Sequence, residues 1–312
     1  MTTPQAFEGS YTVAVTPFTD DASAIDVSRL KGFLDWQLES GVPGIIMLGS
    51  TGEFLTLTRD ERRLLVDETV RHIDGRIPVL VGATNAFTPF AIEAAQDAAE
   101  LGADGLMIAP PYYYTPTDDE VFWYYEAITD AVDLPIMLYN NPVTTNVDMS
   151  AALVARLAKA FPTVSYIKES SQEVERVGEV VELAGDDMVV YAGEKPVDSY
   201  LLGAKGYVNP YGNYIPRASA GMWGLLESGR IDEARHIDDL IHRFDAIIAE
   251  GHPTYGHQAY SKELARRQGH PVGPVRAPIT RFDQIGPEGE ERAARIMTIL
   301  GEIDDYAQQI GL

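Results

Sequence analysis

The chain has 312 residues, of which 45% are hydrophobic and 23% are charged, a composition typical of a globular protein with a sizeable core. Its formal net charge of -23 at pH 7 argues against nucleic acid as a partner, because phosphates would be repelled. The absence of cysteine excludes disulfides, thiolate nucleophiles and Cys-ligated metals, and the longest apolar runs are only strand-sized. With an N-terminus that lacks the pattern of an export signal, these features predict a cytoplasmic protein without a membrane partner.

Short apolar runs alternate with longer segments of helical periodicity over residues 1–229. This alternation is typical of βα units around a parallel sheet, and we predict an α/β fold, a (β/α)8 TIM barrel. The predicted strands are residues 11–16, 44–48, 78–81, 105–109, 135–139, 164–168, 188–191 and 206–209. The predicted helices are residues 27–40, 59–73, 90–101, 118–131, 150–160, 173–183, 196–202 and 216–227.

Three further helical patterns follow the last βα unit, at residues 231–250, 255–268 and 288–309. Because no Ser/Gly-rich linker separates them from the barrel, they are not expected to form an independent domain. We predict a catalytic barrel over residues 1–229 and a C-terminal helical extension, residues 230–312, packed on it.

Two residues with reactive side chains stand at predicted strand ends, where barrels of this kind build their sites. Lys168 ends the sixth strand, and burial there would lower the pKa of its amine and make it a nucleophile for a carbonyl group. Tyr139 ends the fifth strand, and its phenol could move protons at the resulting carbinolamine. The alternatives are a surface lysine at a strand exit and an aromatic side chain that fills the barrel mouth.

The segment Gly49-Ser50-Thr51-Gly52-Glu53 follows the second strand. Glycines allow close approach of the backbone, and adjacent hydroxyls with backbone N–H groups could bind a carboxylate. Ordinary turns have the same composition, and Glu53 could instead cap a helix or support the residues that bind the ligand.

Tyr113 lies in a run of three tyrosines after the fourth strand, where packing, an interface or a proton relay are the alternatives. The histidines show no metal-ligand spacing, and we predict neither a metal nor a cofactor.

With residues 49–53 (GSTGE), 139–142 (YNNP) and 167–169 (IKE) in this order and spacing, the chain resembles the dihydrodipicolinate synthase / N-acetylneuraminate lyase family over its whole length. The resemblance implies a (β/α)8 barrel with a C-terminal helical extension, assembled as a homo-oligomer, a tetramer or a dimer. It implies that Lys168 forms a Schiff base with a small 2-oxo acid and that Tyr139 is the acid/base residue.

The resemblance also implies roles for residues on other strands. Ser50 and Thr51, with Gly49, would contact the carboxylate of the oxo acid, and one of the hydroxyls would also hydrogen-bond the tyrosine. Tyr113 would cross a dimer interface to complete a neighbour's proton relay. The backbone carbonyl of Val208 would lie near the bound oxo acid.

One position departs from the family pattern. Biosynthetic dihydrodipicolinate synthases usually carry an arginine two residues beyond the proline of the tyrosine loop, and Thr144 stands in its place here. A neutral hydroxyl cannot supply the bidentate, charged contact that arginine makes with a carboxylate. Thr144 remains a candidate substrate-binding residue, but this departure argues against a true dihydrodipicolinate synthase.

We therefore predict a Schiff-base-forming lyase, an aldolase or dehydratase, that acts on pyruvate or a longer 2-oxo acid such as a 2-keto-3-deoxy sugar acid. The alternatives are a 4-hydroxy-tetrahydrodipicolinate synthase, an enzyme like a hydroxypyrroline-carboxylate deaminase, or a non-catalytic member that binds a keto acid.

Overall fold

The computed structural model describes residues 7–250 and 257–312. Eight strands close into a parallel barrel in chain order, which confirms the predicted TIM barrel. The strands are β1 (Gly9–Val13), β2 (Ile45–Met47), β3 (Val79–Gly82), β4 (Gly105–Ile108), β5 (Ile136–Asn140), β6 (Val164–Glu169), β7 (Val189–Ala192) and β8 (Gly206–Asn209).

Each strand is followed by at least one helix. The helices up to β8 are α1 (Val27–Glu39), η1 (Phe54–Thr56), α2 (Arg59–Ile73), α3 (Thr88–Glu100), α4 (Asp118–Thr129), α5 (Pro142–Thr145), α6 (Ala151–Ala160), α7 (Glu175–Ala184), η2 (Gly185–Asp187) and α8 (Pro196–Leu201). Those after β8 are η3 (Tyr211–Asn213), α9 (Pro216–Glu227), α10 (Ile231–Ala249), α11 (His257–Arg267), α12 (Phe282–Ile285) and α13 (Pro287–Gln309).

The C-terminal helices agree in position with the predicted extension, although the predicted start at residue 255 lies outside the described residues. Among the helices described, none is long and apolar enough to cross a membrane. The boundary between residues 229 and 230 stays a prediction.

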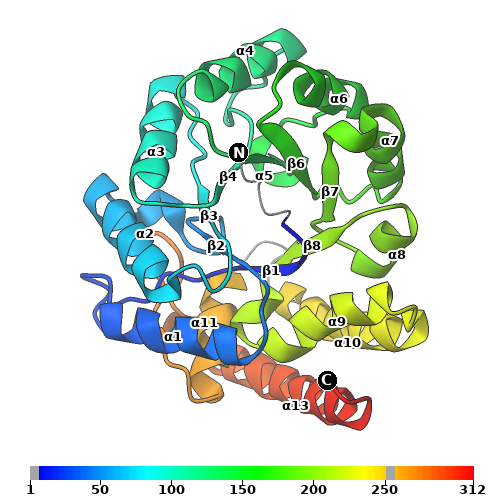
Figure 1. Ribbon diagram of the computed structural model, residues 1–312. Helices are drawn as coiled ribbons and strands as arrows, with labels where there is room; N and C mark the ends of the chain where they lie inside the picture. Colours follow the sequence, from blue (N-terminus) through cyan, green and yellow to red (C-terminus); the bar gives the residue numbers. More distant parts are fainter. Residues whose placement is uncertain (1–6, 251–256) are drawn as a thin grey trace. The chain divides into compact units, whose positions relative to one another are not determined.

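The chain forms two compact units, each discontinuous in sequence. In the first unit, α3, α4, α6 and α7 follow one another around the outside of strands β3 to β7 (Figure 1). The second unit contains α1, α2 and the helices from α9 onward. The first unit comprises Met1–Tyr11, Pro43–Ile45 and Gly75–Val208, and the second comprises Thr12–Val42, Ile46–Asp74 and Asn209–Leu312.

Capping boxes explain why two helices begin where the sequence predicts. The Thr58 side chain accepts a hydrogen bond from the Glu61 N–H, and the Glu61 carboxylate accepts one from the Thr58 N–H, at the start of α2. Thr117 and Glu120 repeat this arrangement at the start of α4. Each reciprocal pair satisfies two backbone donors that the first helical turn leaves without a partner.

Strand β1 is the clearest departure from the predicted bounds. Residues 11–16 were expected to be extended, but the strand runs from Gly9 to Val13. The N–H of Val15 donates instead to the Asn213 side chain at 2.9 Å. This side-chain acceptor replaces the strand ladder at the point where β1 ends.

Aromatic rings pack in the core of the first unit, and glycines leave room for them. The ring centroid of Tyr191 lies 5.9 Å from that of Tyr11 and 6.2 Å from that of Tyr166. A Cβ atom at Gly206 would lie 2.1 Å from the Tyr191 ring, and one at Gly44 would lie 2.0 Å from the Tyr11 ring. Gly206, the first residue of β8, and Gly44, directly before β2, therefore need to be residues without a side chain.

Replacing Gly206 with alanine is expected to lower the free energy of unfolding by about 1–3 kcal/mol, because the added methyl group must displace a buried ring. Urea denaturation would measure the loss. Gly224→Ala is the control. Gly224 lies in helix α9, and a Cβ atom there would meet no other atom within 4 Å. The control should be neutral or stabilising by up to about 1 kcal/mol, and equal losses in both variants would contradict this account of the core.

Candidate active site

Lys168 and Tyr139 lie beside each other at the ends of two neighbouring strands. Strands β5 and β6 pair in parallel, with Tyr139 opposite Lys168. The Nζ atom of Lys168 lies 4.4 Å from the centroid of the Tyr139 ring, and the two residues are only 7% and 9% exposed. The structure therefore brings together the amine and the phenol that the sequence predicts as reactive groups.

A register shift in β6 produces this pairing. Val164 lies opposite Ile136, but the next residue of β5, Met137, lies opposite Tyr166, so Ser165 is an extra residue in β6. The N–H of Ser165 accordingly donates within its own segment, to the carbonyl of Thr163 at 3.1 Å. Without this bulge, the residue opposite Tyr139 would be the one before Lys168.

The hydrogen bonding of Tyr139 suits proton transfer. Its hydroxyl oxygen accepts a hydrogen bond from Nδ2 of Asn141 at 2.7 Å. Because the amide donates in this contact, the phenolic proton remains available for a substrate oxygen. An amine and a proton donor therefore adjoin each other at one buried point, as addition to a carbonyl group requires.

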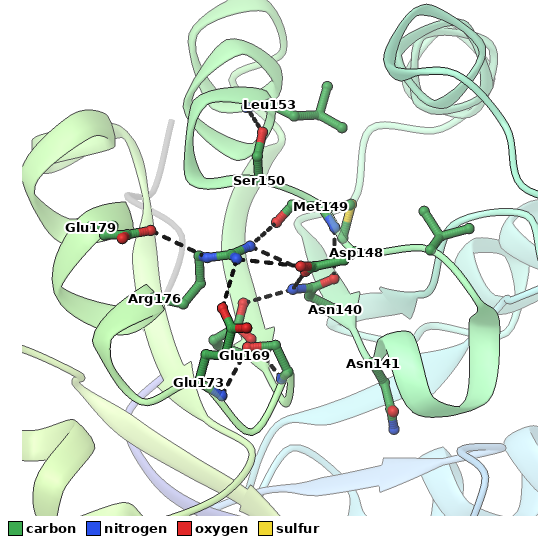
Figure 2. A network of polar contacts seen from close by, with 12 residues as sticks. Asn140, Asn141, Asp148, Met149, Ser150, Leu153, Glu169, Glu173, Arg176 and Glu179 are labelled. Atoms are coloured by element: carbon green, nitrogen blue, oxygen red, sulfur yellow. Dashed lines mark hydrogen bonds and ion pairs between the residues drawn. The ribbon is translucent and has the colours of Figure 1, made fainter.

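The next residues of the two strands point to the opposite face, because side chains alternate along a strand. Nδ2 of Asn140 donates to Glu169 Oε2 at 3.0 Å and to Asp148 Oδ1 at 3.1 Å, and its Oδ1 accepts from the N–H of Met149 at 2.9 Å. Figure 2 shows Asn140 inside this network and Asn141 directed away from it. The end of β5 is thereby fixed to the end of β6 and to the segment before α6.

Arg176 of helix α7 completes the network, and its side chain is only 12% exposed. Its guanidinium donates to the carbonyl of Met149 at 2.9 Å, to Asp148 at 3.1 Å and to Glu173 at 3.0 Å (Figure 2). A guanidinium can make several such contacts at once because its donors are held in a rigid plane. The start of α7 is therefore tied to the two strands that carry the reactive pair.

Glu169 is a buried carboxylate within this network. Burial raises its pKa, while hydrogen bonds from Ser171 and Asn140 and the charge of Arg176 act in the opposite direction. Its Oε1 accepts from the Ser171 N–H at 2.7 Å, so donors reach both oxygens. Loss of either donor would therefore raise the pKa of Glu169 further.

Gly193, after β7, makes a close approach to the end of β6. Its N–H donates to the carbonyl of Glu169 at 2.7 Å. A Cβ atom at this position would lie 1.7 Å from Oγ of Ser170 and 2.7 Å from that carbonyl oxygen. Only glycine therefore allows this contact directly after Lys168.

The predicted carboxylate-binding residues belong to the second unit and lie on a tight turn. The N–H of Gly52 donates to the carbonyl of Gly49 at 3.0 Å, and the Gly52 carbonyl accepts from Oγ1 of Thr16 at 2.6 Å. Thr51 is 6% exposed, and Ser50 is half-buried. Consecutive backbone N–H groups in such a turn can form an anion-binding concavity.

The remaining predicted site residues have different environments. Tyr113 is 94% exposed and has a positive φ of 89°. Thr144 is also exposed, and on α5 its Oγ1 donates to the carbonyl of Asn141 at 3.3 Å. Val208 is fully buried in β8.

The sequence did not single out Asn140, Asn141 or Arg176. The two amides had a usable signal, because they directly follow the predicted strand at residues 135–139. Arg176 had none, since it contacts Met149 and Asp148, 27 and 28 residues earlier in the chain. Contacts of this kind cannot be inferred from local periodicity.

Asn140→Asp is expected to lower the free energy of unfolding by about 3–5 kcal/mol at pH 8, because it buries a charge beside Glu169 and Asp148 and removes their donor. The loss should become smaller at pH 5.5, since burial already raises the pKa of Glu169 and protonation relieves the repulsion. Urea unfolding at both pH values would measure this. Asn85→Asp keeps the oxygen that accepts from the Phe87 N–H at 3.0 Å, so this control should change stability by less than about 0.5 kcal/mol. A loss that does not depend on pH would refute the explanation.

Comparisons with known proteins agree with this geometry. The model of the dihydrodipicolinate synthetase family matches residues 6–295. A 4-hydroxy-tetrahydrodipicolinate synthase from Persephonella marina is 37% identical over 250 residues, which are 79% of this chain and 85% of that protein.

Two solved structures extend the likeness to nearly the whole chain. The 4-hydroxy-tetrahydrodipicolinate synthase from Methylacidiphilum fumariolicum has a TM-score of 0.89 at 27% identity, covering 97% of this chain and 99% of that one. A dihydrodipicolinate synthase from Acinetobacter baumannii, complexed with pyruvate, has a TM-score of 0.86 at 29% identity, covering 95% and 99%. The chain therefore belongs to the dihydrodipicolinate synthetase family and is a lyase of the Schiff-base-forming type.

Proposed function

We propose that this lyase is a 4-hydroxy-tetrahydrodipicolinate synthase that joins pyruvate to aspartate semialdehyde through an imine on Lys168. The contact between Lys168 and Tyr139 carries the proposal for the chemistry. The choice of substrates rests on the names of the relatives. The comparisons do not support the sugar acid favoured from the sequence, nor the expectation that the chain is not a true dihydrodipicolinate synthase.

In the proposed reaction, Lys168 acts first and Tyr139 acts after it. The Lys168 amine attacks the C2 carbonyl of pyruvate, and the carbinolamine loses water as Tyr139 supplies a proton to the departing oxygen. Loss of a proton from C3 converts the imine into an enamine. The enamine carbon adds to the aldehyde carbon of the second substrate, whose oxygen becomes a hydroxyl group. The amino group of that substrate then displaces Lys168 from C2 and closes the ring.

The roles of the binding residues are part of the same proposal. We assign Ser50 and Thr51, with Gly49, to the carboxylate of pyruvate, and the backbone carbonyl of Val208 to the neighbourhood of the bound acid. The tight turn at residues 49–53 supports this assignment, because it carries two consecutive hydroxyl residues and backbone N–H groups of the kind that bind anions.

We also propose a homo-oligomer, a tetramer or dimer, in which Tyr113 takes part in a neighbour's proton relay. A tyrosine that is 94% exposed is well placed for contact with another subunit. The cytoplasmic location expected from the sequence stays a prediction.

Borohydride reduction in the presence of pyruvate should add the mass of the reduced pyruvyl group to a peptide that contains Lys168, because reduction traps the imine. Lys168→Arg should abolish the adduct, whereas Lys159→Arg, at an exposed position on α6, should retain it. Tyr139→Phe should lower kcat by about 10²–10⁴-fold, the usual effect of losing an acid/base group. Peptide mass spectrometry and a coupled assay with pyruvate and aspartate semialdehyde would measure these results.

Two outcomes would separate the parts of the proposal. An adduct on Lys168 without turnover of aspartate semialdehyde would refute the choice of substrate and retain the imine. No adduct with any 2-oxo acid would refute the imine chemistry and favour a protein that only binds keto acids.

Thr144→Arg provides a test of the second substrate. An arginine at this exposed position would add a charged donor for the carboxylate of aspartate semialdehyde. We expect its KM to fall by up to about tenfold, with the KM for pyruvate unchanged. Val143→Arg, on the neighbouring residue of α5 and 67% exposed, controls for the added charge. Steady-state kinetics that show the same change in both variants would contradict a specific role for position 144.

A further inference from the structure

A buried ion pair lies at the end of the turn at residues 49–53. Nζ of Lys262 lies 2.5 Å from Oε1 of Glu53, and their side chains are 2% and 0% exposed. The ammonium also donates to the carbonyl of Pro274 at 2.9 Å and lies 4.3 Å from the centroid of the Phe18 ring. Removing two charges from water costs free energy that can cancel their attraction, so such a pair adds little to the stability of the fold by itself.

Glu53 holds a backbone conformation that needs support. Its φ of 58° lies in the left-handed region, which a residue with a side chain adopts at a cost. Its second carboxylate oxygen accepts from the N–H of Arg276 at 2.8 Å. Lys262 and Arg276 therefore contact the two oxygens of one carboxylate and hold the residue that ends the turn.

Helix α11 makes a second contact with the same turn. Nε2 of Gln258 donates to the carbonyl of Ser50 at 3.4 Å. Gln258 and Lys262 are four residues apart, so they lie on the same face of α11. This face contacts Ser50 and Glu53, on either side of Thr51.

We propose that Lys262 is a positioning residue for the carboxylate of the 2-oxo acid, acting through Glu53 on the turn at residues 49–53. The inference rests on the proposed function, which assigns Ser50 and Thr51 to that carboxylate. It makes the C-terminal helices part of the substrate-binding apparatus rather than packing alone.

The contacts of the Lys262–Glu53 ion pair predict that it affects substrate binding rather than the chemical steps. Hydrogen bonds to a carboxylate weaken steeply with distance and angle, so a displaced turn loses affinity for the oxo acid. The Lys168–Tyr139 pair is held by strands β5 and β6 and by the Asn140 network, none of which contains Glu53 or Lys262. Loss of the ion pair should therefore weaken pyruvate binding and leave the chemical steps intact.

The test measures the pyruvate concentration that gives half-maximal borohydride trapping on Lys168. In Glu53→Gln and Lys262→Met this concentration should rise about tenfold or more, as expected for a misplaced binding group, with the trapped fraction at saturation unchanged. Lys262→Arg should recover part of the affinity because it retains the charge. Glu53→Gln keeps an acceptor for the Arg276 N–H and therefore retains one contact of the turn. If Lys262→Met does not fold, Glu53→Gln alone provides the measurement.

Glu263→Gln is the matched control. Glu263 forms ion pairs with Arg266 and Arg267 on the same helix, away from the turn contacts described for Gln258 and Lys262. Its half-maximal concentration should equal that of the wild type.

Three outcomes overturn the inference. An unchanged half-maximal pyruvate concentration in folded Glu53→Gln refutes the role of Lys262. If the wild type still forms the adduct, the proposed function is unaffected by that result. A loss of trapping at saturating pyruvate, with affinity retained, assigns the pair to the chemistry instead. A wild type that forms no adduct refutes the proposed function, and this inference with it.

Discussion

The register between β5 and β6 is the constraint on which the reactive pair depends. Two residues opposite each other on parallel strands project to the same face, and a slip of one residue would exchange the faces. The extra residue Ser165 sets the pairing beyond it, so that Lys168 meets Tyr139 and Glu169 meets Asn140. One bulge therefore decides both which side chain adjoins the phenol and which carboxylate joins the network behind it. Bulges are over-represented beside active sites, where the extra residue re-aims the side chains that follow it.

The two faces of these strand ends have different physical tasks. On one face the amine of Lys168 contacts an aromatic ring. On the other, Asn140, Glu169 and Arg176 form a connected set of hydrogen bonds around a carboxylate whose pKa is raised by burial. A connected polar network is rigid because each member's partners fix its orientation, whereas a partly connected one would cost stability. The polar groups that fix the backbone are thereby separated from the Lys168 amine.

The sequence predicted the parts of this protein that local patterns determine. Alternating apolar runs identified the strands, and helical periodicity placed two helix starts where the structure has the capping boxes of Thr58 and Thr117. Lys168 was recognisable because a lysine at the end of a buried strand is unusual. The bulge at Ser165 was not, because its neighbours are chemically ordinary. The contacts of Arg176 and Lys262 could not be predicted either, since their partners become neighbours only after the chain has folded.

Lys168 and Lys262 show how the partner of a buried lysine determines its use. Both are almost fully buried, and the chain has only six lysines. Burial lowers the pKa of Lys262 to about 8 even though the adjacent Glu53 charge opposes the shift by favouring the ammonium form. An ammonium group paired with a carboxylate is a poor nucleophile, but it can fix the position of the residue that carries the carboxylate. The partner described for Lys168 is the Tyr139 ring, whose attraction for a cation is weaker than that of a buried carboxylate. Under the proposed function, the same side chain is a reactive amine at one strand end and a fixed charge beside the turn at residues 49–53.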